Sequence, residues 1–334
     1  MASAADRWAQ PRVHPERSRI VSLEALRAAA QELRGVAIET PLLPQPALAE
    51  RTGVPVLLKC EHLQPMGAFK IRGAYTAISR IPPELRGRGV ITYSSGNHGQ
   101  AVAYAARRLG LRAVVVMPER APAIKVEGVR RLGGEVVIAG NSSAERYDRA
   151  QRMSQDEGLV MVPPFESLDV IAGQGTCGLE ILQQYPSVTT IIVPVGGGGL
   201  IAGIAAAVAA IKPDVNVIGV EPTGAPKLAR ALEAGRPVKL DHTESLADGL
   251  LPLSIGELPF SVLSGLVHHA VQVSEEEIVA AVRFLYHQAG LSVEPSGAVT
   301  TAALLSHRIR PTGPTVALVS GGNVDPALLR DLVH

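Results

Sequence analysis

Short apolar runs alternate along this chain with alanine-rich segments of helical length. The runs are rich in valine and isoleucine, which is typical of strands that are buried on both faces of a parallel sheet. The pattern predicts an α/β fold in which parallel twisted sheets are flanked by helices. We expect strands at 54–59, 90–93, 113–117, 135–138, 190–195, 215–220 and 314–320, and helices at 73–80, 99–110, 123–133, 144–158, 175–184, 200–211 and 274–289.

The segment 88–165 contains a strand–helix series of its own. We expect it to form a small domain inserted into a larger one, which 1–87 and 166–334 make together, with a cleft between the two. A length of 334 residues suits two domains of ordinary size. The N-terminus is charged, contains proline and lacks the apolar core of a signal peptide, so its first residues are predicted to be a loose tail.

The composition excludes several classes of protein. Hydrophobic residues make up 46% of the chain and charged residues 19%, which predicts a sizeable core and little disorder. A net charge of +1 without a long basic run, and only 3% aromatic residues, argue against nucleic acid as a partner. The cysteines Cys60 and Cys177 form no recognisable disulfide or zinc pattern, so a reducing, cytoplasmic location is expected.

The uncharged stretch 189–211 is long enough to span a bilayer. However, Pro194 and four consecutive glycines interrupt it, and they would leave backbone groups unpaired in lipid. We therefore predict a buried strand, a tight turn and a buried helix there, and no membrane association.

Lys70 lies near the start of a predicted helix, and its neighbours Ala68, Phe69 and Ile71 are apolar. A partly buried amine binds protons less tightly, which makes it a usable nucleophile and base. Such an amine can form a Schiff base with a carbonyl cofactor. Since most lysines lie at the surface, the segment alone leaves an ordinary surface lysine as the alternative.

The segment Ser94, Ser95, Gly96, Asn97 and His98 follows one predicted strand and opens a helix. The free N–H groups of a helix start, with hydroxyls and amides around them, suit a carboxylate. An ordinary helix cap is the alternative. A packed or capping histidine is as consistent with His98 as a catalytic one.

Four consecutive glycines, Gly196, Gly197, Gly198 and Gly199, join a predicted strand to a predicted helix. Their backbone amides can hold a phosphate dianion, helped by the helix dipole. The same region, 197–202, also satisfies the G-x-G-x-x-G/A dinucleotide pattern, and Glu221 ends the next strand where a ribose-binding acid belongs. An NAD-dependent oxidoreductase is therefore the alternative from a different class.

Ser320 ends the last predicted strand, at the edge of a parallel sheet where α/β proteins bind ligands. Its hydroxyl can bond a pyridine nitrogen without placing a charge on it, although a plain strand-to-turn junction would have the same sequence. Pyridoxal 5'-phosphate needs both an amine and a phosphate turn, so Lys70, the four glycines and Ser320 together favour this cofactor.

In these segments the chain resembles the fold-type II pyridoxal-phosphate enzymes, which have a tryptophan synthase β-like fold. Within them it resembles the serine/threonine dehydratase and serine racemase group, from about Ile20 to the C-terminus. The motifs that carry the likeness are F-K-I-R-G-A at Lys70, S-S-G-N-H-G-Q at Asn97, V-I-A-G-Q-G-T at 170–176, G-G-G-G-L at 196–200, V-E-P-S-G-A at 293–298 and S-G-G-N at Ser320.

The resemblance implies a role for each candidate residue. Lys70 would form the Schiff base and act as the catalytic base, and Ser95 would be a second catalytic acid/base on the opposite face of the substrate. The cofactor-binding residues would be Phe69 beside the ring, Asn97 at the ring hydroxyl, Gly196, Gly197, Gly198, Gly199 and Leu200 at the phosphate, Gly249 in the pocket wall and Ser320 at the pyridine nitrogen. The substrate carboxylate would lie among Ser94, Ser95, Gly96, Asn97 and His98.

The implied activity is dehydration and deamination of L-threonine and L-serine to 2-oxobutanoate or pyruvate plus ammonia. Phe165 resembles the dehydratases more than the mammalian-type racemases, but Ser95 keeps an amino-acid racemase as an alternative. The unaligned segment 249–260 leaves another β-hydroxy amino acid open as substrate. The resemblance also implies a homodimer and, because the chain ends soon after Asn323, no isoleucine feedback.

The racemase-like members of the group bind a divalent ion through an acid, a backbone carbonyl and a second acid. Glu221 and Ala225 match the first two of these ligands, but Lys227 stands where the second acid would be. We hypothesise that the Lys227 ammonium pairs with Glu221 and replaces the ion, because one positive charge can satisfy the carboxylate. We therefore predict no bound metal.

Overall fold

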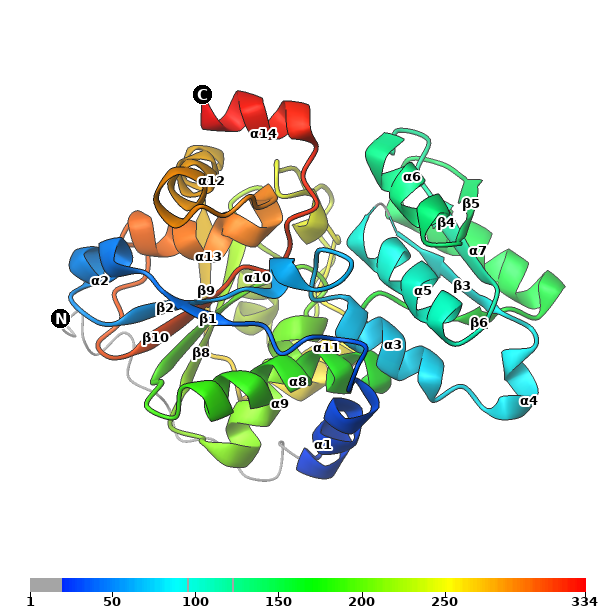
Figure 1. Cartoon of the computed structure of the whole chain (residues 1–334), viewed down its shortest axis with the longest axis horizontal. Coiled ribbons are helices and arrows are strands. Elements are labelled where there is room, and N and C mark those ends of the chain that lie inside the picture. Colours follow the sequence, from blue (N-terminus) through cyan, green and yellow to red (C-terminus); the bar gives the residue numbers. More distant parts are fainter. Residues whose placement is uncertain (1–19, 95, 122) are drawn as a thin grey trace.

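The computed structural model describes residues 20–94, 96–121 and 123–334, so the predicted N-terminal tail lies outside the described residues. These residues form two separate sheets, which Figure 1 shows side by side. The larger sheet has six strands in the order β1-β2-β10-β7-β8-β9, and the smaller has four in the order β5-β4-β3-β6.

Almost all neighbouring strands of the six-stranded sheet are parallel; the exception is β1, which pairs antiparallel with β2. The prediction of parallel sheets is confirmed apart from this edge strand. The strands are β1 (Leu42–Pro44), β2 (Val56–Lys59), β7 (Thr190–Pro194), β8 (Asn216–Pro222), β9 (His269–Val273) and β10 (Thr315–Leu318).

Alternate side chains of these strands enter two different cores, because successive residues of a strand face opposite sides of a sheet. Ile191 and Val193 of β7 pack with one set of helices, whereas Ile192 packs with another. The first set is α1 (Leu23–Glu32), α8 (Leu168–Gln184), α9 (Gly199–Ile211), α10 (Lys227–Ala234) and α11 (Glu257–Leu263). The second set is α2 (Pro46–Thr52), α12 (Glu275–Ala289), α13 (Pro295–Leu305) and α14 (Pro326–Val333).

The four-stranded sheet is parallel throughout and lies entirely within 88–165. Helices α5 and α6 cover one face of it and α7 covers the other. Helix α3 also packs on α5, so it contacts both units, and the domain division at 87/88 stays a prediction. The elements are β3 (Val90–Tyr93), β4 (Ala113–Met117), β5 (Glu135–Ile138), β6 (Val160–Met161), α3 (Ile71–Ser79), α4 (Pro83–Arg86), α5 (Asn97–Arg108), α6 (Ala123–Arg131) and α7 (Ser143–Glu157).

The apolar stretch 189–211 forms β7, the glycine turn and α9, as its sequence predicts. Helix α9 is buried along most of its length against the larger sheet. Within the described ranges, no helix has both the length and the apolarity needed to cross a membrane.

Helix α8 begins at Leu168 rather than at 175, so the predicted start of this helix is wrong. Its first turn is capped by the Ser167 hydroxyl, which accepts a hydrogen bond from the backbone N–H of Val170 at 3.4 Å. The glycines of α8 allow close packing of neighbouring helices: Gly173 packs against α3, and Gly175 and Gly178 pack against α9. A Cβ added to Gly173 would lie 2.7 Å from the Cα of Gly73, so only glycine permits this approach of the two helices.

A buried arginine joins α3 to the larger unit. Arg72 is 1% exposed, and its guanidinium donates to Glu61 at 2.7 and 2.8 Å and to Glu180 at 2.6 and 2.7 Å. Glu180 also accepts a hydrogen bond from the buried Lys59 amine at 2.6 Å. Although burial acts in the opposite direction, Arg72 and then Lys59 hold the pKa of Glu61 below its ordinary value. Two cations and two carboxylates therefore compensate one another in a dry interior.

We predict that Arg72→Met lowers the free energy of unfolding by about 3–5 kcal/mol, because it leaves the buried Glu61 without its paired cation and Glu180 with Lys59 alone. Arg308→Met is the matched control, since Arg308 pairs with Glu277 at the surface and is 53% exposed. Its cost should stay below about 1 kcal/mol. Urea unfolding followed by circular dichroism measures both, and equal midpoints for the two variants would contradict the role given to Arg72.

Candidate active site

The predicted lysine and serine segments lie against each other at the carboxyl edge of the larger sheet. Ala68 and Gly321 form an isolated antiparallel bridge, and the N–H of Phe69 donates to the Ser320 carbonyl at 3.1 Å. Ser320 follows β10, just as the glycine turn follows β7. The structure therefore brings Lys70 to the end of the strands where α/β proteins bind ligands.

Lys70 is partly buried, and its amine donates to the backbone carbonyl of Pro164 at 2.9 Å. The amine also lies 5.3 Å from the centre of the Phe69 ring. Burial lowers the pKa of Lys70 to about 8, and no carboxylate among the described residues opposes this shift. Near neutral pH a larger fraction of this amine is therefore unprotonated than of an exposed lysine, as a nucleophile or base requires.

The four-glycine turn lies beside the same segment. A Cβ on Gly197 would overlap the ring of Phe165, the residue after Pro164, and Gly198 has a φ of +96°, which favours glycine. Helix α9 begins at Gly199, so its unpaired N–H groups are directed at the turn. The turn has no side chains of its own, so its backbone N–H groups can form a cradle for a phosphate dianion.

Asn97 is fixed by two polar side chains from the larger unit. Its amide nitrogen donates to Glu294 Oε1 at 2.6 Å, and its amide oxygen accepts from Asn323 at 2.9 Å. Glu294 is 3% exposed, and burial, reinforced by the charge of Asp248, raises its pKa to about 7. The orientation of Asn97 is therefore set before any ligand arrives.

A second contact joins the two units close to Asn97. The ammonium of Lys125, on α6, forms an ion pair with Asp248 in the 3-10 helix η4 (Asp248–Leu250). The Lys125 side chain is 11% exposed and passes 3.4 Å from where a Cβ on Gly96 would lie. A positive charge therefore stands next to the predicted substrate-binding loop.

The predicted substrate-binding loop is only partly described. The Ser94 hydroxyl accepts a hydrogen bond from the N–H of Gly96 at 3.1 Å, whereas Ser95 lies outside the described residues. His98 is 3% exposed, and its Nε2 lies 3.1 Å from the Val162 carbonyl. Burial, followed by the charge of Lys70, lowers the pKa of His98 to about 3, so the imidazole is neutral near pH 7 and has the character of a packed histidine.

Ser320 and Gly249 are linked through one residue of the V-E-P-S-G-A motif. The Ser320 hydroxyl donates to the Ser296 carbonyl at 3.4 Å, and the Ser296 hydroxyl accepts from the N–H of Gly249 at 3.0 Å. Ser320 is 3% exposed. The motif thus holds both predicted cofactor-binding residues on one helix start, that of α13.

Several residues at this site were missed as functional candidates in the sequence: the Pro164 carbonyl, Glu294, Lys125 and Asp248. Two of them carried a signal, since Glu294 lies within the V-E-P-S-G-A motif and Asp248 precedes Gly249. Lys125 carried none, because only the fold places its helix next to η4.

The dinucleotide alternative fails at its acidic residue. Glu221 is fully buried, and its two carboxylate oxygens accept the N–H groups of Leu228 at 2.8 Å and Ala229 at 2.9 Å. Because this carboxylate has no exposed surface, a ribose hydroxyl cannot reach it.

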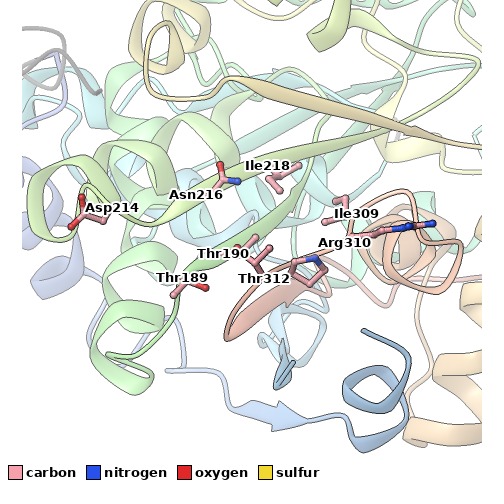
Figure 2. Close-up of a pocket in the computed structure, with 9 residues that line it drawn as sticks. Thr189, Thr190, Asp214, Asn216, Ile218, Ile309, Arg310 and Thr312 are labelled. Atoms are coloured by element: carbon pink, nitrogen blue, oxygen red, sulfur yellow. The ribbon is translucent and has the colours of Figure 1, made fainter. Parts of the chain in front are cut away.

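A separate pocket lies at the opposite edge of the larger sheet (Figure 2). Its lining includes Thr190 and Asn216, the first residues of β7 and β8, and Arg310 and Thr312 shortly before β10. The glycine turn and Ser320 lie at the other ends of these strands. This pocket is therefore distinct from the site around Lys70.

An amine that is neutral enough to attack a carbonyl, set beside a phosphate cradle, is the arrangement that a pyridoxal-phosphate enzyme requires. The two units with their parallel sheets place the chain among the enzymes of fold type II. Comparison with known proteins agrees, since the family described as "Pyridoxal-phosphate dependent enzyme" matches residues 33–321. The chain belongs to this family.

Its relatives carry two kinds of name. An L-threonine ammonia-lyase of Thermotoga maritima is 42% identical over 316 residues, which are 94% of this chain and 79% of the relative. The structure of maize serine racemase superimposes with a TM-score of 0.90 at 38% identity, over 93% of this chain and 96% of the other. A crystal structure of a bacterial threonine deaminase gives a TM-score of 0.86 at 42% identity, over 91% of this chain and 99% of the other.

Replacement of the lysine should abolish covalent capture of the cofactor. We expect Lys70→Ala, incubated with pyridoxal phosphate and then borohydride, to show no pyridoxyl group by mass spectrometry. The exposed Lys239 provides the control, and Lys239→Ala should be labelled on the peptide that contains Lys70. Stoichiometric labelling of Lys70→Ala would assign the Schiff base to another lysine.

The rate of this capture should depend on pH in a way that reflects the burial of Lys70. Only the unprotonated amine attacks the aldehyde, and burial lowers the pKa of Lys70 to about 8. The rate of cofactor loading into the cofactor-free protein should therefore rise with pH and reach half its maximum near pH 8. An exposed lysine would give a midpoint at about pH 10.4. Stopped-flow absorbance of the Schiff base measures the profile.

Proposed function

We propose that this enzyme is an ammonia-lyase that converts L-threonine and L-serine to 2-oxobutanoate or pyruvate plus ammonia. The observation that carries the proposal is the partly buried Lys70 amine, whose pKa is about 8 and which contacts Pro164 next to the glycine turn. The names of the relatives, threonine ammonia-lyase and threonine deaminase, support the choice of substrate.

The residues at the sheet edge fit pyridoxal phosphate. The turn 196–199 and Leu200 would hold its phosphate, Asn97 its ring hydroxyl and Ser320 its pyridine nitrogen, with Phe69 beside the ring and Gly249 in the pocket wall. The bound cofactor would supply stabilisation of negative charge at the Cα of the amino acid. Hydrogen bonds or close packing within the protein position all these groups.

The protein's own residues would then divide the proton transfers. The Lys70 amine takes the proton from Cα, while the N–H groups at the start of α5 and the Ser94 hydroxyl orient the substrate carboxylate. The uncharged Ser320 hydroxyl, turned from the Ser296 carbonyl, would donate to the pyridine nitrogen and leave it without a charge, which would favour loss of the β-hydroxyl over reprotonation of Cα. The Cα proton and the β-hydroxyl would leave together as water, and a second water molecule would hydrolyse the resulting imine to the 2-oxo acid and ammonia.

Racemisation is the second candidate function, since maize serine racemase is among the similar structures. It requires a proton donor on the face of the substrate opposite Lys70, and the sequence offers Ser95 for this role. We also infer that the enzyme works as a homodimer in a reducing, cytoplasmic environment. The reducing environment is supported by Cys60 and Cys177, which are both buried and form no disulfide.

Proton NMR of the cofactor-loaded enzyme in deuterated water distinguishes these activities. With L-threonine we expect signals of 2-oxobutanoate, and with L-serine signals of pyruvate. Formation of the D-enantiomer, with loss of the Cα proton signal and no 2-oxo acid, would replace the lyase by a racemase, and Ser95→Ala should then stop formation of the D-enantiomer. Absence of both reactions, with the cofactor bound, would exclude L-threonine and L-serine as substrates.

A further inference from the structure

A lysine without exposed surface lies outside the catalytic site. Lys227 is the first residue of α10, and its amine donates to the carbonyl of Ala225 at 2.9 Å. The same amine lies 3.8 Å from Glu221 Oε2 at the end of β8, and neither side chain is exposed to solvent. Nothing in the proposed reaction uses this pair.

The carboxylate of Glu221 attaches α10 to the sheet. It accepts two backbone N–H groups from the first turn of the helix, those of Leu228 and Ala229. A carboxylate buried to this degree needs a nearby cation as well as its hydrogen bonds.

The Lys227 ammonium contacts the oxygens that a metal ion at this position would use, a carboxylate oxygen and a backbone carbonyl. Calcium and magnesium bind about six or more oxygen ligands, which include water molecules and negatively charged carboxylates. A fixed ammonium fills the space and repels a second cation. Among the residues that the structure describes, no group of three or more His, Cys, Asp or Glu side chains is arranged to hold a metal.

The loop that Lys227 holds leads to the active site. The carbonyl of Gly224 accepts from the N–H of Glu244 at 3.1 Å, and a Cβ on Gly224 would overlap the backbone of Glu244. The chain from Glu244 continues directly to Asp248 and Gly249, which lie beside Glu294 and Ser296. Displacement of the 221–227 loop would therefore move one wall of the pocket.

We infer that the Lys227 ammonium is a covalently attached counter-ion that holds the end of β8 to the start of α10 in place of a divalent cation. The stability of the enzyme is accordingly independent of magnesium and calcium. The family that the chain resembles includes members with a divalent ion at this position. The residues of this chain do not fit a divalent ion. The inference does not depend on which amino acid is the substrate.

The test follows thermal unfolding of the cofactor-loaded enzyme in a chelator, in magnesium chloride and in calcium chloride. The wild-type unfolding temperature should be the same in all three. Lys227→Met should unfold at a temperature lower by on the order of 5–10 °C, because it leaves Glu221 buried without a cation, and neither salt should restore it. Lys227→Asp should be destabilised in the chelator and restored by at least one of the two salts, since it adds a second carboxylate. Lys239→Asp, at an exposed position, controls for the change of charge.

Three results would overturn the inference. The first is a wild-type enzyme that loses stability in the chelator or gains it with either salt. The second is a Lys227→Met variant as stable as the wild type. The third is a Lys227→Asp variant that stays equally unstable in all three solutions. Because the readout is unfolding, a failure here is distinguishable from a wrong choice of substrate, and if Lys227→Asp does not fold, the wild type and Lys227→Met still decide.

Discussion

The pairing of Arg72 with two carboxylates is the interaction on which the site depends. Lys70 precedes Arg72 by two residues, so the start of α3 cannot shift without separating the guanidinium from Glu61 and Glu180. Those carboxylates belong to the segment after β2 and to α8, elements that are far apart in sequence. A planar guanidinium can form paired hydrogen bonds with two carboxylates at once, which a lysine at this position could not do. The Lys70 amine is therefore positioned by buried charges, while no carboxylate among the described residues opposes the lowering of its pKa by burial.

This separation of charges explains how one short segment serves two opposite requirements. A lysine close to a carboxylate would stay protonated. Among the described residues, the Lys70 amine instead contacts the neutral carbonyl of Pro164 and lies near the ring of Phe69. The charged groups near the site form pairs of their own, since Lys125 binds Asp248 and the raised pKa of Glu294 reduces its charge. The surroundings of the Lys70 amine therefore carry little net charge, while hydrogen bonds and ion pairs hold the neighbouring residues in place.

The seven strands predicted from the apolar runs are all present, because buried parallel strands have a strong local signal. Strands β1, β6 and β9 were not predicted, since β1 and β6 have only three and two residues and the side chains of β9 are mostly half-buried. In the site, Lys70, the glycine turn and Ser320 were recognisable because each has a chemical reason to stand at a strand or helix end. Glu294, Asp248 and Lys125 were not, because their significance arises from contacts between distant segments.

The pair of Lys227 with Glu221 was predictable only in part. The family resemblance suggested the pairing, because Glu221 and Ala225 match two ligands of the racemase-like metal site and Lys227 stands at the third. The contact with the Ala225 carbonyl and the helix-capping role of Glu221 needed the structure. Both buried clusters follow one rule: a charge is admitted to the interior only where the backbone and an opposite charge together satisfy it. In this fold each such cluster lies where a strand of the larger sheet gives way to a segment that shapes the pocket.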